Sequence, residues 1–343
     1  MLQHEITRRR PLLDSKGNIA EPGFARRLLP VYSRKDIRAG ALRVKEWDYY
    51  LINNGRFALA LTVADNGYMG LDSISFIDLE NLWQQTSSPI SLLPLGRRHM
   101  PASSAAGDVA VKSRDYSISF RHIVGGRLLS FEMKSFSGSL PISGEISLSG
   151  EPEESIVMCT PFRKGAHFYF NQKINCMRAS GSVYVRGRHY SFDPADSFAV
   201  LDWGRGVWTY SNTWYWGSAS GELDGVPFGF NIGCGFGDTS AATENCLFYG
   251  GRLHKLSRVS FNIPRRAGEY SYMSPWTFTS DDGRFEMDFR PVLDRSADMD
   301  VKLLRSEQHQ VFGLFSGTAV LDNGVKLRLR DFPGFAERVA NKW

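Results

Sequence analysis

Apolar and polar residues alternate with a period of two along much of the chain, and this pattern limits the fold more than any other feature. In Phe285–Arg290, for example, Phe285, Met287 and Phe289 alternate with charged residues. Successive side chains of a strand point to opposite faces, so the alternation indicates strands with one face in a core and one in water. The same pattern recurs at Tyr116–Arg121, Leu129–Lys134 and Arg258–Ile263.

Short turn signals lie between the apolar runs. They are Asn66-Gly67, Gly125-Gly126, Asp224-Gly225, Asp282-Gly283 and Asn323-Gly324. Such pairs supply the positive φ that two-residue hairpin turns need. Strands joined by short turns form antiparallel meanders, and closing such a sheet removes its exposed edges. We therefore predict an all-β fold of antiparallel barrels or half-barrels.

Helices are expected to be few and short. Phe76–Gln84 predicts one or two helical turns. Pro333–Lys342 predicts a short C-terminal helix, and Phe335 and Val339 would share a face that could extend to Trp343.

The length predicts two domains, because 343 residues exceed the size at which a single hydrophobic core stops growing. The segment Asp193–Asp196 interrupts two apolar stretches. We place the boundary there, which gives an N-terminal domain of residues 1–195 and a C-terminal domain of residues 196–343.

Charge and composition argue against several classes of partner. The net charge is only +5, and the basic residues are spread along the chain, whereas a nucleic-acid binder concentrates them on one element with stacking aromatics. We therefore expect no nucleic acid. The run Arg8–Arg10 fits either a solvated tail or peripheral contact with an anionic membrane surface. The oligomeric state cannot be inferred.

The sequence favours a reduced intracellular environment. Residues 1–18 lack the apolar stretch of a secretory signal, and no window of about 18 apolar residues exists. Cys159, Cys176, Cys234 and Cys246 are scattered without a C-x-x-C pair, which is typical of reduced, mostly buried thiols. We expect the cytoplasm. Dinucleotide-binding, P-loop, G-x-S-x-G and H-E-x-x-H motifs are absent, so no cofactor or metal is implied.

Tryptophans are concentrated in one segment. Four of the eight lie within fourteen positions, at Trp203, Trp208, Trp214 and Trp216. On a strand, Trp214 and Trp216 would share one face and Tyr215 would take the other. They predict either the wall of an apolar ligand pocket, where indole faces also stabilise a cation, or a plug closing one barrel end above an Asp202–Arg205 pair.

A glycine-rich segment follows. Gly229, Gly233, Gly235 and Gly237 have a period of two, so one strand face is nearly bare. A bare face allows close approach of a ligand or of another backbone, and a tight strand crossing at a barrel corner is the alternative. The segment leads to Glu244 and Asn245.

Two further segments offer polar side chains. His167 and His309 stand alone, without a carboxylate–histidine cluster at metal-ligand spacing. Near the N-terminus, Glu46 and Asp48 fall on one strand face among aromatics. These two acids either face solvent together or face the interior of the N-terminal barrel and pair with a basic residue.

Several of these segments resemble the bacterial and fungal family called domain of unknown function 2804, over almost the whole chain. They are Lys45–Tyr50, His167–Met177, Leu201–Tyr210, Gly229–Asn245 and His309–Gly313. That family is similar to the lipocalin-related calycins. Its Asp-Trp-Gly…Trp-x-Trp element resembles the Asn-Trp-Gly…Trp-x-Trp element of tocopherol cyclases, and it is more distantly similar to carotenoid hydratases and lipocalin-like pericyclases. The resemblance implies two calycin-type domains with a pocket in or between them. Asp202 stands where the cyclases have Asn, so their chemistry does not transfer directly.

The first functional hypothesis is an enzyme that hydrates, isomerises or cyclises an apolar or isoprenoid-like molecule by acid catalysis. Burial of a carboxyl raises its pKa, as a proton donor in an apolar pocket requires. Glu244 or Asp202 would be the acid, and Arg205 would orient it. The residues expected to bind the ligand or donate hydrogen bonds are Trp203, Trp208, Trp214, Trp216, Asn245, His309, His167 and Asn171.

Two other classes stay open. Lipocalin-like barrels often hold one lipophilic ligand without changing it. Alternatively, Asp202 and Glu244 are the paired carboxylates of a carbohydrate-active enzyme, with the tryptophans as sugar platforms.

Overall fold

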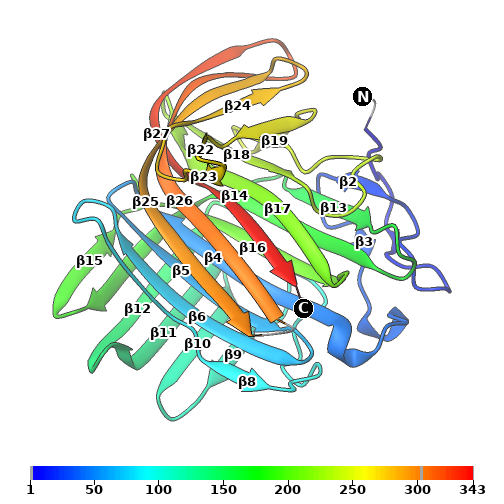
Figure 1. The fold of residues 1–343 in the computed structure, drawn as a ribbon, viewed down its shortest axis with the longest axis horizontal. Helices are drawn as coiled ribbons and strands as arrows, with labels where there is room; N and C mark the ends of the chain where they lie inside the picture. Colours follow the sequence, from blue (N-terminus) through cyan, green and yellow to red (C-terminus); the bar gives the residue numbers. More distant parts are fainter. Residues whose placement is uncertain (1–2, 302–303, 343) are drawn as a thin grey trace.

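The computed structural model describes residues 3–301 and 304–342, and their long elements are all β-strands (Figure 1). No α-helix occurs among these residues, and the two helical turns are the 3-10 segments η1 (Arg34–Asp36) and η2 (Ala41–Arg43). The prediction of an all-β fold built from antiparallel half-barrels is confirmed.

The first sheet has fourteen strands and curls until β7 contacts β11. Along its main path the order is β7 (Trp83–Ser87), β6 (Met69–Asp78), β5 (Phe57–Asp65), β4 (Val44–Asn53), β16 (Phe198–Val207), β14 (Phe168–Val185), β12 (Leu140–Ser149), β11 (Gly126–Ser137), β10 (Tyr116–Ile123) and β9 (Val109–Lys112). Off this path, β8 (Ile90–Leu92) pairs with β6, while β13 (Ile156–Pro161) and β15 (Arg188–Phe192) pair with β14; β2 (Gly23–Ala25) pairs with β13.

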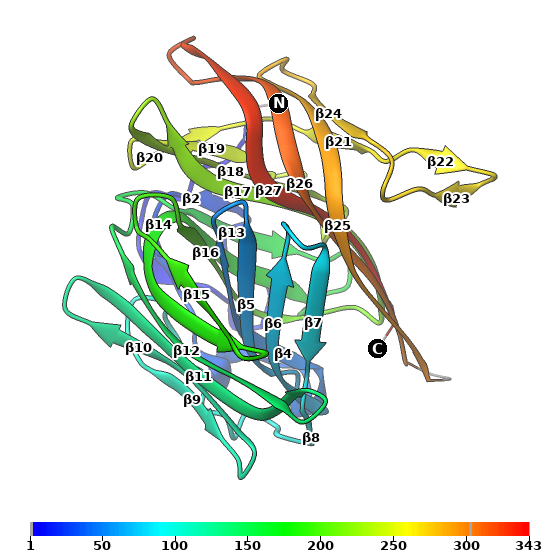
Figure 2. The same cartoon turned by 90° about the vertical axis from the view of Figure 1, so that its left-hand side faces the viewer.

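The second sheet has nine strands and curls until β21 contacts β18. Its order is β20 (Arg252–Lys255), β19 (Cys246–Tyr249), β18 (Val226–Cys234), β17 (Ser211–Leu223), β27 (Lys326–Lys342), β26 (Leu304–Val320), β25 (Phe285–Val301), β24 (Trp276–Ser280) and β21 (Val259–Asn262). Two small sheets complete the fold, the parallel pair β1 (Arg10–Pro11) and β3 (Pro30–Val31), and the hairpin β22 (Arg265–Arg266) and β23 (Glu269–Tyr270), which projects from the body (Figure 2).

Each curled sheet encloses its own apolar core, and a third core lies between the two sheets. Ile52, Leu59 and Phe76 point into the first half-barrel. Phe230 and Phe315 point into the second half-barrel. Strands such as β4 and β16, which lie between the sheets, are buried on both faces. The third core holds Tyr49, Leu51, Ala58, Trp216, Phe312 and Phe335 among others. The two half-barrels therefore pack outer face to outer face.

Both expected helices are wrong. Phe76–Gln84 contains the end of β6, a turn and the start of β7, and Pro333–Lys342 lies within β27. Residues four apart share a face in a strand as well as in a helix, so the spacing of Phe335 and Val339 did not distinguish a strand from a helix. Trp343 lies outside the described residues. Hydrogen-bonded pairing with β17 and β26 on its two sides favours the extended form of β27.

The strands change sheet between Val207, the end of β16, and Ser211, the start of β17. The segment Asp193–Asp196 is the turn between β15 and β16, two strands of the first sheet. The division at residue 195 stays a prediction. All four cysteines are free, and three of them are buried. Within the described residues, no helix is long and apolar enough to cross a membrane.

Candidate functional site

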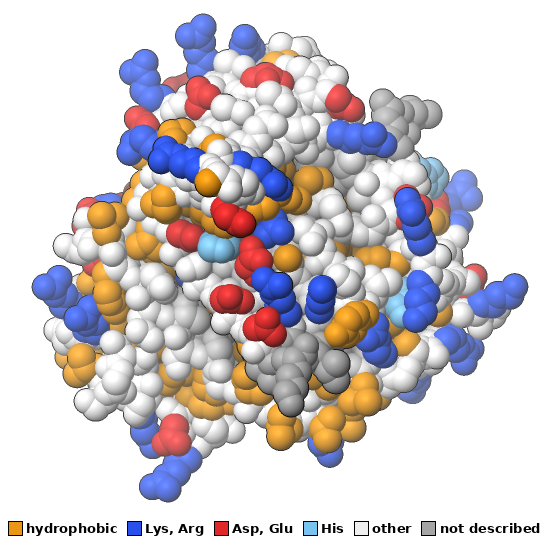
Figure 3. Space-filling view, viewed as in Figure 1, with side chains coloured by type: hydrophobic (Ala, Val, Ile, Leu, Met, Phe, Trp, Pro, Cys, Tyr) orange, Lys and Arg blue, Asp and Glu red, His pale blue; other side chains and the backbone are white. Residues whose placement is uncertain are grey.

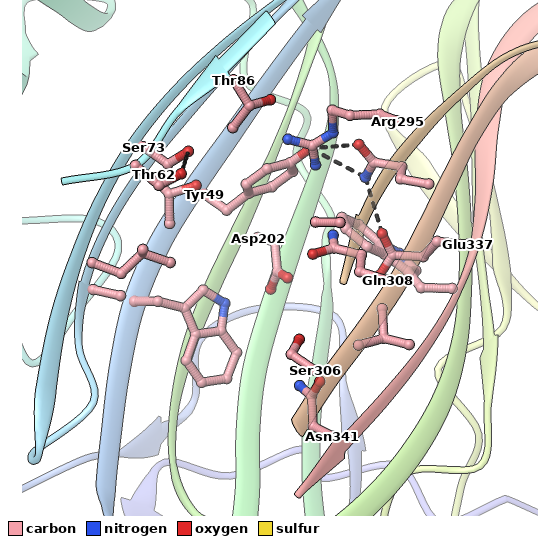
Figure 4. Close-up of a pocket in the computed structure, with 18 of the residues that line it drawn as sticks. Tyr49, Thr62, Ser73, Thr86, Asp202, Arg295, Ser306, Gln308, Glu337 and Asn341 are labelled. Atoms are coloured by element: carbon pink, nitrogen blue, oxygen red, sulfur yellow. Dashed lines mark hydrogen bonds between the residues drawn. The ribbon is translucent and has the colours of Figure 1, made fainter. Parts of the chain in front are cut away.

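A cavity of about 670 Å³ lies between the outer faces of the two sheets (Figure 4). One wall consists of β4–β8, β14 and β16 of the first sheet. The other wall consists of β17 and β25–β27 of the second sheet, and Phe236 and Glu244 are added from the segment after β18. The pocket implied by the family resemblance is therefore between the half-barrels.

Strand β4 shows how the alternating sequence builds both sides of this wall. Trp47 and Tyr49 point into the cavity. Glu46 and Asp48 point into the first half-barrel, where Glu46 pairs with Arg34 and Asp48 pairs with Arg205. Of the two orientations left open by the sequence, the interior one is correct.

Two rows of side chains run across the sheets and face each other over the cavity. In the first sheet, cross-strand neighbours place Lys173, Asp202, Tyr49, Thr62 and Ser73 side by side. In the second sheet, cross-strand neighbours place Gly233, Trp216, Glu337, Gln310 and Arg295 side by side. Each row draws on five different strands, so the site exists only when both sheets have formed.

Three contacts join the two walls of the cavity. The Lys173 ammonium lies 3.8 Å from the centre of the Trp216 ring, which is cation–π distance. The Tyr49 hydroxyl lies within 3.4 Å of the Gln310 amide (Figure 4). Arg295 donates a 2.8 Å hydrogen bond to the Ser75 hydroxyl of β6. Polar contacts therefore fix the separation of the two walls.

Asp202 is an ion-paired carboxylate. Its Oδ2 lies 2.8 Å from the Lys173 ammonium, and its Oδ1 accepts a hydrogen bond from the Asn171 side-chain amide. Both residues come from β14, the strand beside Asp202. The Asp202–Lys173 pair is neutral as a whole.

Glu337 is a buried carboxyl group without an ion pair among the described residues. Its side chain is 4% exposed, and it accepts hydrogen bonds from Trp214 Nε1 at 3.3 Å and from Gln310 Nε2 at 3.0 Å. Burial raises the pKa of Glu337 to about 7, although the nearby Arg295 and Lys173 cations act to lower it. Such a group both gives and takes a proton near neutral pH.

Glu244 is a second carboxyl group without an ion pair in the described chain. Its Oε2 accepts a 3.1 Å hydrogen bond from Asn231, whose own amide oxygen accepts one from Trp216 Nε1. Burial raises the pKa of Glu244, and the Lys173 cation partly offsets this effect. Glycine at position 233 makes room for the carboxylate, because a Cβ there would overlap Glu244. The bare strand face predicted for the glycine segment is therefore covered, at position 233, by the Glu244 side chain and not by a ligand or another backbone.

Aromatic rings close the deep end of the cavity. Tyr169, Trp208 and Phe236 are buried against one another, and Trp47 and Trp214 pack on this cluster. The Trp47 indole lies directly on β16, where only glycine fits at position 204, because a Cβ there would penetrate the ring. Most of these rings meet edge to face, an arrangement that aromatic pairs favour, and together they make this end of the cavity apolar.

The opposite end of the cavity is polar and open to solvent. Its exposed lining residues on the first sheet are Thr86, Ser88 and Ile90, and those on β25 are Ser296, Ala297 and Asp298. Thr62, Ser73 and Gln84 lie on the same side of the cavity. A bound molecule therefore meets hydroxyl and amide groups near the mouth and aromatic rings at depth.

The cavity contains five of the residues selected from the sequence. They are Asp202, Glu244, Trp208, Trp214 and Trp216. Trp214 and Trp216 face the cavity as the alternation predicted, and Tyr215 on the other face lies 3.2 Å from the Tyr270 hydroxyl. Asn171 does not line the cavity, but it lies on the same face of β14 as Lys173 and donates a hydrogen bond to Asp202.

Trp203 and Arg205 point away from the cavity into the first half-barrel. Arg205 is fully buried, with Asp48 as its ionic partner and the carbonyl oxygens of Trp47 and Pro101 as acceptors. Its guanidinium stacks on the Trp203 ring. The expected Asp202–Arg205 contact is therefore wrong, because positions three apart on a strand lie on opposite faces.

The remaining candidates are also outside the cavity. Asn245 accepts a hydrogen bond from the Gly233 amide and donates one to the Ser257 carbonyl oxygen. His167 contacts the Gly165 carbonyl oxygen in a loop.

His309 lies on the opposite face of β26 from Gln310. It stacks on Tyr272 at 3.8 Å and lies 2.7 Å from the Asp294 carboxylate. Figure 3 shows charged side chains of both signs around a histidine where β25 and β26 lie.

The sequence interpretation missed the residues that complete the site. They are Trp47, Tyr49, Tyr169, Lys173, Phe236, Arg295, Gln310 and Glu337. Trp47 and Tyr49 lay in a segment already singled out, and alternation along β27 would have grouped Glu337 with Phe335 and Val339. In the described chain, no three His, Cys, Asp or Glu side chains are grouped closely enough to hold a metal ion.

Fold and site together define a lipocalin-like β protein with a cavity between two half-barrels. The chain belongs to the family described as "Domain of unknown function (DUF2804)", whose model matches residues 3–343. No curated protein sequence matches it.

Solved structures are similar to this chain at low sequence identity. A candidate AttH protein from Nitrosomonas europaea is 12% identical, with a TM-score of 0.52 over 88% of this chain and 92% of that chain. Kievitone hydratase from Nectria haematococca is 11% identical, with a TM-score of 0.49 over 97% and 98%. CghA with Sch210972 is 10% identical, with a TM-score of 0.47 over 96% and 97%.

Proposed function

We propose that this protein is an enzyme that isomerises, cyclises or hydrates an apolar small molecule by acid catalysis, with Glu337 as the proton donor. The observation that carries the proposal is a buried carboxyl group in an aromatic cavity, without an ion pair in the described chain and with a pKa raised to about 7. General acids work best when their pKa lies near the working pH.

The other two carboxyl groups fit different roles. Asp202 is held by Lys173 and Asn171, which suits an anion that balances charge in the cavity. Glu244 faces the same space, and only its Oε2 is engaged by a described side chain. It is the second candidate for proton transfer, at the deep end.

In the proposed step, Glu337 transfers its proton to one carbon of a substrate double bond. The π electron pair forms the new C–H bond, the other carbon becomes cationic, and Glu337 becomes a carboxylate. The cation then loses a proton from a neighbouring carbon, or adds a hydroxyl group or water that releases one. Glu337 takes back this proton in each case. The indole faces of the deep end stabilise the cation, and the aromatic wall limits access of water to it.

Replacement of the acid tests the proposal. Wild type, E337Q, E244Q and D202N are incubated with the small-molecule extract of the host, and consumed and formed compounds are followed by mass spectrometry. We expect E337Q to lower turnover by about a hundredfold to ten-thousandfold while it still binds the substrate. The control E145Q changes a carboxylate on β12 outside the cavity and should react like wild type.

Two results contradict the proposal. Full turnover in E337Q removes Glu337 from the chemistry. A compound that binds stoichiometrically to wild type and is recovered unchanged instead identifies a lipophilic-ligand carrier.

A further inference from the structure

Arg295 is the cation of the cavity that lacks an anionic partner within the described residues. It lies on β25 and extends toward the first sheet near Tyr49 and Thr86 (Figure 4). Its Nη1 donates to the Ser75 hydroxyl, and its buried Nε has no hydrogen-bond partner. The other cavity cation, Lys173, is matched by Asp202 at 2.8 Å.

The surroundings of Arg295 suit an oxygen-rich group of a ligand. Thr62, Ser73, Gln84 and Gln308 line the same region, and the Ser75 and Thr86 hydroxyls are bonded to each other at 2.8 Å. The carboxyl group in the same cross-strand row, Glu337, is already hydrogen-bonded to Trp214 and Gln310. A guanidinium with free donors binds carboxylate or phosphate oxygens strongly, often through two parallel hydrogen bonds.

We infer that Arg295 forms a subsite for an anionic head group, so that the ligand is an amphiphile with a carboxylate near the mouth and an apolar body at the aromatic end. This inference rests on the proposed function in placing the substrate in the cavity. It names the class of substrate, an apolar organic acid, and its orientation. The anion lies on the polar side of Glu337, and the carbon skeleton extends past Glu337 toward Trp214 and Phe236.

The test compares two probes that share one isoprenoid chain and differ in the head group, farnesoic acid and farnesol. Binding is followed by quenching of the tryptophan fluorescence at about pH 7, where the carboxylic acid is ionised. We expect wild type to bind farnesoic acid at least about tenfold more tightly than farnesol. R295M should bind the two probes about equally, because methionine keeps the apolar stem and removes the charge.

Controls separate this subsite from other roles. R290M removes an exposed arginine of the same strand, paired with Asp331 at 3.2 Å, and should keep the wild-type preference. E337Q should also keep the preference, so loss of turnover and loss of head-group recognition are measured separately. Farnesoic acid should also raise the melting temperature of wild type more than that of R295M.

Three outcomes overturn the inference: equal affinities in wild type, binding of neither probe, or a preference that survives in R295M. If R295M melts earlier than wild type and keeps the preference, Arg295 serves only to join the sheets through Ser75. The wild-type comparison needs no variant, so the inference can be refuted even where R295M does not fold.

Discussion

The interior of the first half-barrel and the cavity between the sheets both contain buried carboxyl groups, but the partners of these groups differ. Inside the half-barrel, Asp48 meets the fully buried Arg205, and Glu46 meets Arg34. In the cavity, Glu337 and Glu244 receive only hydrogen bonds from neutral groups in the described chain. Ion pairing satisfies a buried charge, whereas burial without an ion pair raises the pKa of a carboxyl group and makes its proton available for chemistry.

The largest expected effect on stability comes from breaking the interior pair. Arg205→Met leaves Asp48 buried without its cation and also leaves the Trp47 and Pro101 carbonyl oxygens without their donor. We expect a loss of about 3–5 kcal/mol in the free energy of unfolding, measured by urea denaturation. The control Arg290→Met breaks an exposed pair and should cost less than about 1 kcal/mol. Equal effects of the two variants would contradict a structural role for the interior pair.

The next effect is a pH dependence that Glu337 adds to stability. Its pKa is raised from the ordinary 4.5 to about 7, chiefly by burial, so the folded state binds the proton more tightly than the unfolded state. The stability that Glu337 contributes is fully present below pH 4.5 and is lost as the pH rises through 7.

Comparison with E337Q isolates this contribution. Relative to E337Q, wild type should lose about 3 kcal/mol of unfolding free energy as the pH rises through this window. Urea denaturation of both proteins across the window measures the difference. A difference that is constant with pH would show that burial does not perturb Glu337.

A smaller effect is expected for the Lys173–Asp202 ion pair of the cavity. Lys173→Met removes the cation of Asp202, but Asp202 keeps its hydrogen bond from Asn171 and faces the open volume of the cavity. We expect a loss of about 1–3 kcal/mol, below that of Arg205→Met, in the same urea assay. A cost equal to or above that of Arg205→Met would show that the cavity is as dry as the half-barrel interior.

The parts of the fold that could be predicted are those that depend on the alternation of apolar and polar residues within a single strand. Trp214 and Trp216 were assigned to one strand face from their spacing alone, and that face lines the cavity. Local spacing failed at β27, because a separation of four residues fits both a strand and a helix face. It also failed for His309, which is adjacent in sequence to Gln310 but lies on the other face of β26.

The rest of the site depends on strand pairing that no short segment contains. Glu337 becomes a neighbour of Trp216 and Gln310 only through the register of β17, β27 and β26. Lys173 reaches Asp202 only through the register of β14 and β16. Arg205 was expected to pair with Asp202 because the two residues are close in sequence. In the structure Arg205 forms its ion pair with Asp48 of the neighbouring strand. The strands between the sheets are buried on both faces, so polar residues on them are not confined to a solvent-facing side. Their position in the sequence therefore does not indicate which of them line a site.

Titration of the Glu337 side chain tests directly whether this residue can act as the acid. Wild type and E337Q, labelled with 13C at the glutamate carboxyl carbon, are followed by NMR across the pH range, and the signal missing in E337Q belongs to Glu337. We expect a midpoint at about pH 7. A midpoint at the ordinary value near 4.5 would contradict it, because Glu337 would then be an ionised side chain that cannot serve as the acid.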